Sequence, residues 1–244
     1  GFLYSYAPGR GSDIAKSFLD GYKGYVQSDG FRSYNFLNTH TDIEHFGCWA
    51  HVRRKFNDVL KVSGYRHKGL ANEAMKMIRD LYKIEKKAKV EGLGEEDLYV
   101  LRQKTSKPII KKFETWLADH SGEIPEGSLL GKSVKYTTGQ WLLLKKYVEN
   151  GIVRMDNNLA ENAIRPFVIG RKNWLFNMTQ EGAEATALFY SLIETAKANA
   201  WNPFNYLKHL FEVFPKTEKT PEALFMLLPM NISETQLDKE FELP

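Results

Sequence analysis

Cysteine is almost absent from this sequence of 244 residues, and the single thiol, Cys48, excludes a disulfide bond within the chain. One unpaired cysteine suits a reducing compartment, so we expect a cytoplasmic protein. Long apolar runs are also missing, since no stretch approaches the roughly 20 residues that cross a bilayer. The opening Gly-Phe-Leu-Tyr-Ser-Tyr segment is neither basic nor long enough for a signal peptide. These absences argue against a membrane protein and a secreted one.

A phosphate-binding loop of the nucleotide-binding type is absent too, because the segment 8–11 (Pro-Gly-Arg-Gly) has no Lys-Ser or Lys-Thr after it. The net charge of +4 and the pI near 8.9 are only mildly basic. This charge permits binding to a phosphate backbone but does not demand it. With 43% hydrophobic residues, the chain can bury a sizeable core, as one large domain or as a domain with an insertion.

Two carboxylates stand at the ends of predicted elements. Residues 25–29 predict a short strand that ends in Asp29, and Gly30 then allows a sharp turn. The run 156–166 predicts a short helix that Asp156 or Asn157 caps, that carries Glu161, and that Pro166 ends. Mg²⁺ and Mn²⁺ prefer carboxylate oxygens, so Asp29 and Glu161 are candidate ligands of one metal site. Either residue alone is equally well explained as a turn former or a solvated side chain.

Periodicity predicts strands at 2–6, 25–29 and 43–48, separated by helices at the segments that begin at Ser12 and at 31–37. This β-α-β-α-β order is typical of parallel and mixed sheets. Apolar residues at three- and four-residue spacing then predict helices at 49–62, 70–89, 95–119, 129–150, 181–199 and 203–214. Residues 171–176 predict a short strand or hairpin arm.

Basic residues near these elements are candidate DNA contacts. Arg165, Arg171 and Lys172 flank the predicted Glu161 helix, and arginine grips phosphate with two hydrogen bonds. Arg53 and Arg54 lie on one helical turn, where successive residues fan out around the axis, so a solvated helix face explains them equally well. Trp174 could stack on an unpaired base, although its apolar neighbours favour a place in the core.

A competing site is the set His45, Cys48 and His51, whose side chains can bind zinc. The predicted geometry is unfavourable, because His45 belongs to a strand and His51 to a helix. We therefore interpret Cys48 as a small buried residue and His51 as an active-site neighbour or a core histidine.

Four blocks of the sequence together resemble the transposases of the IS66 insertion-sequence family. They are 48–56 (Cys-Trp-Ala-His-Val-Arg-Arg-Lys-Phe), 156–161 (Asp-Asn-Asn-Leu-Ala-Glu), 170–176 (Gly-Arg-Lys-Asn-Trp-Leu-Phe) and 191–199 (Ser-Leu-Ile-Glu-Thr-Ala-Lys-Ala-Asn). The resemblance implies an RNase H-like catalytic domain with an Asp-Asp-Glu triad, in which Asp29 matches the second Asp and Glu161 the Glu. It also implies two Mg²⁺ or Mn²⁺ ions in the full-length enzyme, DNA as the partner at insertion-sequence ends and target, and a place at the bacterial nucleoid. A homo-oligomer is one option that the sequence leaves open.

The sequence departs from that family at the first triad Asp, for which these residues have no equivalent strand. We therefore expect a carboxy-terminal piece of a longer transposase, inactive by itself, with a predominantly helical α/β fold. This fold would be a partial RNase H-like fold, lacking its first strands. The expected regions are a partial core at 1–48, a helical insertion at 49–150, the return to the core at 151–214, and a tail at 215–244 that docks on it.

A second departure is Asn162, which stands where relatives often have Arg. In the complete protein we expect metal-dependent phosphodiester hydrolysis and strand transfer. The alternative is a non-catalytic helical module that binds DNA or another subunit, and metal-dependent cleavage separates the two hypotheses.

Overall fold

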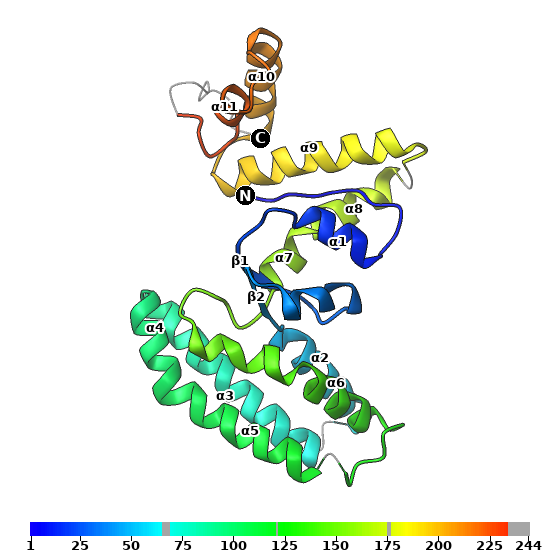
Figure 1. Cartoon of the computed structure of the whole chain (residues 1–244), viewed down its shortest axis with the longest axis vertical. Helices are drawn as coiled ribbons and strands as arrows, with labels where there is room; N and C mark the ends of the chain where they lie inside the picture. The colour runs from blue at the N-terminus through cyan, green and yellow to red at the C-terminus, as the bar shows by residue number, and fades with distance from the viewer. Residues whose placement is uncertain (65–68, 121, 175–176, 234–244) are drawn as a thin grey trace. The chain divides into compact units, whose positions relative to one another are not determined.

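The computed structural model describes residues 1–64, 69–120, 122–174 and 177–233, apart from the side chains of Asn173 and Trp174. The chain divides into two compact units, one made of residues 9–159 and the other of residues 1–8 with 160–244. Both are mostly helical, and the described residues include two short parallel strands (Figure 1). The prediction of a predominantly helical α/β fold is therefore confirmed, whereas its RNase H-like character stays a prediction.

The unit 9–159 begins with α1 (Ser12–Phe18) and a parallel pair of strands. Strand β1 (Gly24–Gln27) pairs with β2 (Ile43–Phe46), with Gly24 opposite Ile43 and Gln27 opposite Phe46. A 3₁₀ helix, η1 (Arg32–Thr39), makes the connection. The predicted strands at 25–29 and 43–48 and the predicted helix at 31–37 are confirmed, and both strands end earlier than predicted.

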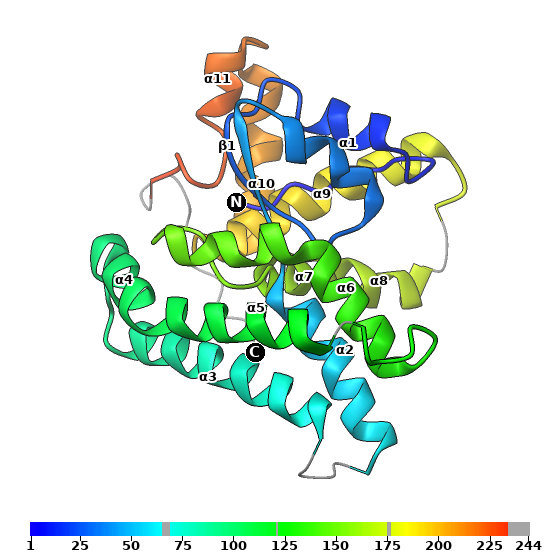
Figure 2. The ribbon, with the colours of Figure 1, turned by 60° about the horizontal axis from the view of Figure 1, so that its bottom comes forward.

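A layer of long helices follows β2 and lies side by side in both ribbon views (Figures 1 and 2). Its elements are α2 (Trp49–Val62), α3 (Leu70–Val90), α4 (Glu95–Leu101), the π-helical turn η2 (Arg102–Ser106), α5 (Lys107–His120), α6 (Leu129–Leu144) and the 3₁₀ helix η3 (Lys145–Glu149). The spacing of apolar residues predicted these helices correctly, because their apolar stripes face one another and exclude water.

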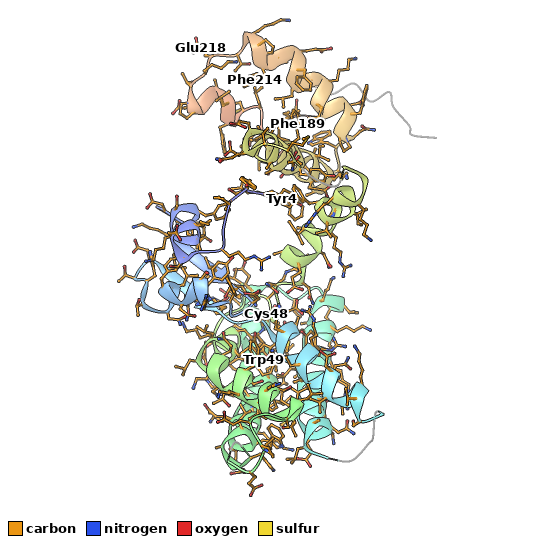
Figure 3. All side chains as sticks on the ribbon, turned by 90° about the vertical axis from the view of Figure 1, so that its right-hand side faces the viewer. Tyr4, Cys48, Trp49, Phe189, Phe214 and Glu218 are labelled. Atoms are coloured by element: carbon orange, nitrogen blue, oxygen red, sulfur yellow. The ribbon has the colours of Figure 1, made fainter. Side chains whose placement is uncertain are left out.

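Aromatic side chains fill the centre of this helical layer. Trp49 is fully buried, and its ring centroid lies 5.8 Å from that of Phe113 and 6.1 Å from that of Trp141. Figure 3 labels Trp49 at the start of α2. Its indole N–H donates to the carbonyl of Leu144 at 2.9 Å, so the polar atom of this buried ring is satisfied. The long helices thus share one packed core.

The other unit contains most of α7 (Asn158–Ala163), then α8 (Arg165–Trp174), α9 (Gln180–Ala198), α10 (Pro203–Val213), the 3₁₀ turn η4 (Phe214–Lys216) and α11 (Pro221–Phe225). The predicted helices at 181–199 and 203–214 are confirmed. Tyr206, fully buried, packs with Ala196 and Ile232, and its hydroxyl donates to the carbonyl of Leu227 at 3.1 Å. Part of the predicted tail therefore contacts α10, while residues 234–244 lie outside the described residues.

The predicted strand at residues 2–6 is wrong. This segment is extended but has no strand partner among the described residues, and it runs along α9 instead. The Phe2 N–H donates to the Thr195 hydroxyl at 2.9 Å, and the Tyr4 N–H donates to the Ser191 hydroxyl at 2.8 Å. Figure 3 shows Tyr4 beside the helix that carries Phe189. The backbone N–H groups of this segment are thus satisfied by side-chain hydroxyls of α9, and not by a neighbouring strand.

The predicted strand at 171–176 is also wrong where the structure describes it, because Arg171 and Lys172 form the last turn of α8. Phe167 on the same helix stacks on Tyr4 and meets Tyr190 edge to face, with centroids 6.1 and 5.1 Å apart. Pro166 does not end the Glu161 helix as predicted. It occupies the first turn of α8, where its missing N–H costs nothing. The helix that carries Glu161 ends at Ala163, and Ile164 separates it from α8.

The side chain of Trp174 lies outside the described residues, so neither of its predicted roles is addressed. Within the described part of the chain, no helix combines the length and the apolar character that crossing a membrane requires.

Candidate functional site

Asp29 occupies a tight turn directly after β1. Its carboxylate oxygen Oδ1 accepts the Phe31 N–H at 2.9 Å, and Gly30 adopts a φ of +80°, a conformation that side chains with a Cβ rarely take. Asp29 is half-buried, while Ser28 before it is buried. The strand and the turn thus hold one carboxylate at a fixed position, and such an oxygen suits Mg²⁺ or Mn²⁺.

A buried polar chain holds the base of this turn. The Ser28 hydroxyl lies 2.8 Å from Nε2 of His45 on β2, and Nδ1 of His45 lies 2.7 Å from the side-chain oxygen of Asn38. Burial, assisted by the nearby charge of Lys146, lowers the pKa of His45 from 6.5 to about 4. The imidazole is therefore neutral near pH 7, with Nδ1–H donating to Asn38 and Nε2 accepting from Ser28.

The segment that precedes Glu161 is fixed against the start of α2. The Cys48 thiol donates to the side-chain oxygen of Asn157 at 2.8 Å, and the Trp49 N–H donates to the carbonyl of Met155 at 3.2 Å. Asp156 accepts the Asn158 N–H at 3.2 Å, which is the capping bond predicted from the sequence. Figure 3 labels Cys48 at this junction.

Tyr82 of α3 adds a second support, because its hydroxyl donates to the other carboxylate oxygen of Asp156 at 2.8 Å. Burial, followed by the charge of Asp156, raises the pKa of this phenol, so it remains a donor. The guanidinium of Arg53 lies 4.9 Å from the centre of the Tyr82 ring. Arg53 thus lies against the tyrosine that binds Asp156, and Arg54 is exposed on α2.

Zinc binding by His45, Cys48 and His51 finds no support in this geometry. Both ring nitrogens of His45 are engaged by Ser28 and Asn38. Burial raises the pKa of the Cys48 thiol, which keeps the sulfur protonated, whereas a zinc ligand must be a thiolate.

Glu161 is half-buried on α7, and Arg165, Arg171 and Lys172 are exposed on α8. Arg165 and Lys172 are seven residues apart, so a helix places them nearly on one face, about 10 Å apart along its axis. Arg171 also lines an open groove of about 680 Å³, together with Tyr6, Phe167 and Thr179. Glu161 and Asp29 belong to different units, so their predicted approach around a metal ion stays a prediction.

Sequence reasoning missed Arg102, which is almost fully buried in η2. Its guanidinium binds both carboxylate oxygens of Glu85, at 2.9 and 2.6 Å. It also donates to the carbonyls of Tyr147, Asn150 and Val153 in the segment that leads to Asp156. The sequence did contain one indication that Arg102 is buried. It lies eight residues before the apolar Ile110, a spacing that turns both residues toward the core side of the helix.

Residues 1–185 match the family model described as "Transposase IS66 family", and residues 191–230 match the "IS66 C-terminal element". The chain therefore belongs to the IS66 transposase family. An uncharacterised protein of Sinorhizobium fredii, y4jD, is 30% identical over 240 residues, which cover 96% of this chain and 46% of that protein. A second one, y4qI, is 31% identical over 212 residues, covering 84% of this chain and 38% of that protein.

The chain thus spans less than half the length of the curated relatives that it matches. No solved structure matches the chain significantly.

Proposed function

We propose that this chain carries two of the three carboxylates of a DNA transposase, Asp29 and Glu161, in a protein that cuts and joins DNA at the ends of an insertion sequence. The observation that carries the proposal is the Asp29 turn, a carboxylate fixed at a strand end inside the region that matches the transposase family. A third carboxylate would come from outside these 244 residues.

The donor set fits a hard divalent cation. The carboxylate of Asp29 is half-buried, takes one backbone N–H, and forms no ion pair within the described part of the chain. We propose that Asp29 and Glu161 hold Mg²⁺ or Mn²⁺. When bound, such ions stabilise the charge that develops in phosphodiester displacement and favour deprotonation of the attacking water or hydroxyl.

The chain's own residues orient the site and bind the substrate. The hydrogen bond from the Phe31 N–H keeps the Asp29 carboxylate in one orientation. The neutral His45 supports the turn through its hydrogen bond with the Ser28 hydroxyl. Arg165, Arg171 and Lys172 offer exposed cations to the phosphates of DNA, and Arg53 and Arg54 add two more on α2. A homo-oligomer on paired DNA ends is part of the same proposal.

The test uses the longer transposase with Asp29→Asn and Glu161→Gln, each of which removes a charge but little volume. Either substitution should lower Mg²⁺-dependent nicking of DNA at least about 100-fold, because a misplaced charge stabiliser costs that much. DNA affinity should change by less than about twofold, since the phosphate contacts remain.

The matched control is Asp97→Asn, an exposed carboxylate in the first turn of α4, which should leave nicking unchanged. Full activity of the Asp29 and Glu161 variants would support the alternative instead, a helical module that binds DNA or another subunit without catalysing its cleavage.

A further inference from the structure

Helix α6, in the helical region between the strands and Glu161, contacts the Asp29 turn directly. The hydroxyl of Tyr136 donates to the backbone carbonyl of Asp29 at 2.7 Å. One helical turn further on, the side chain of Gln140 lies against Gly30, where an added Cβ would be 2.8 Å from the carboxamide carbon and oxygen. Residues four apart share a helix face, so one face of α6 meets both residues of the turn.

The contact of Gln140 with Gly30 is one of packing. The carboxamide oxygen of Gln140 is buried and has no hydrogen-bond partner among the described residues. The position of this side chain is therefore set by its close packing against the backbone of Gly30. This position requires a positive φ and leaves no room for a Cβ beside Gln140. Glycine meets both requirements, with a φ of +80° and no Cβ.

Tyr136 is itself held in place from a third element. The ammonium of Lys55 on α2 lies 4.5 Å from the centre of the Tyr136 ring, an attractive arrangement of a cation and an aromatic face. Three other residues of α6, Val134, Thr137 and Trp141, are buried in the helical layer, and Tyr136 itself packs against the hydrophobic core. The donor that meets Asp29 thus projects from a helix that the core immobilises.

We propose that Tyr136 and Gln140 are positioning residues for the divalent metal site, and that they fix the Asp29 turn in the orientation in which its carboxylate binds the ion. The inference rests on the proposed function, because it assumes that Asp29 is a ligand. It gives the helical region a second role besides connecting the strands to Glu161. Neither residue is proposed to touch the metal or the DNA.

Three measurements on the whole chain test this inference with Tyr136→Phe, which deletes one oxygen. Hydrogen exchange should accelerate about fivefold or more at the backbone amides of residues 28–31, because loss of one hydrogen bond is worth about 1 kcal/mol. The dissociation constant for Mn²⁺, measured by electron paramagnetic resonance of the free ion, should rise by a similar factor. The thermal midpoint should fall by no more than about 4 °C.

Tyr99→Phe is the matched control, because Tyr99 is exposed on α4 and the same atom is removed. It should change neither the exchange rates nor the affinity. Gln140→Ala provides a second variant that removes the packing against Gly30 and should also weaken Mn²⁺ binding.

Asp29→Asn tests whether Asp29 is a metal ligand, independently of the positioning role of Tyr136 and Gln140. If this substitution leaves Mn²⁺ binding unchanged, the assignment of Asp29 as a ligand fails. If it weakens binding while Tyr136→Phe and Gln140→Ala alter neither exchange in the turn nor affinity, the ligand assignment stands and the positioning role is overturned.

Discussion

His45 is a titratable group whose charge the fold suppresses. It is 2% exposed, and both of its nitrogens are committed to neutral partners, Ser28 and Asn38. Protonation would place a second donor against the Ser28 hydroxyl and a positive charge near Lys146. The sequence placed His45 in a strand but could not show that its partners come from the residue after β1 and from η1.

This environment predicts a pH dependence of stability. The folded-state pKa of about 4 lies below the ordinary 6.5, so the unfolded chain binds a proton between these values that the folded chain does not. The stabilisation is fully present above pH 6.5 and declines as the pH falls toward 4, by about 3 kcal/mol. Urea denaturation of the chain between pH 8 and 4 measures it.

His45→Gln should flatten the fall between pH 6.5 and 4, because the titrating group is gone. The exposed His40 serves as the control, and His40→Gln should leave the slope of the wild type. An identical slope in the His45 variant would show that other groups cause the acid sensitivity.

At the scale of elements, α8 illustrates how packing overrides local pattern. The residues at its end resemble a strand by composition, yet they continue the helix whose first turn packs Phe167 on Tyr4 and Tyr190. The helix directs Arg165 and Lys172 to nearly the same side, and their place on one rigid element suits contact with phosphates along a DNA backbone.

Replacing Arg165, Arg171 and Lys172 together with alanine should weaken DNA binding regardless of sequence. The slope of the logarithm of affinity against the logarithm of salt concentration should fall by up to about three, since each lost phosphate contact contributes roughly 0.9. Fluorescence anisotropy with two unrelated duplexes over a series of salt concentrations measures both effects.

The matched control removes the same charge from α3 by replacing the exposed Lys83, Lys86 and Lys87 with alanine. It should reduce the slope much less. Equal losses from both triple variants would mean that binding follows net charge, and that α8 has no special place in it.

At the scale of the whole chain, the larger hydrophobic core is confined to the unit 9–159. It consists of apolar side chains from α2, α3, α5, α6 and the segment up to Met155. The buried ion pair of Arg102 with Glu85 also lies within this unit and ties η2 to the chain that leads to Asp156. Such a core is what an independently folding domain requires.

We expect the segment 9–159, expressed alone, to fold and to unfold cooperatively in urea with a free energy of several kcal/mol. Circular dichroism should show a mostly helical protein, and tryptophan fluorescence should report the same transition, because Trp49, Trp116 and Trp141 are in its core. A broad, probe-dependent transition would mean that residues outside this segment complete the core.

Periodicity in the sequence determined most helices and the two paired strands, because burying one apolar face imposes a repeat of 3.6 or 2 residues that local reading detects. The four sequence blocks likewise determined the family. The strand predictions at residues 2–6 and 171–174 failed. The composition there is compatible with more than one conformation, and contacts with residues distant in the sequence decide which one forms. The boundaries at 48, 150 and 214 remain predictions.

Asp29 could be named from the sequence because a strand-end carboxylate before glycine is a local pattern. Its supports could not be, since Tyr136 and Gln140 lie more than a hundred residues away along the chain and have no special local signal. The sequence by itself thus determined which residues carry the candidate chemistry. Only the tertiary structure decided which side chains hold them in place, because hydrogen bonds and close packing between distant segments exist only once the chain has folded.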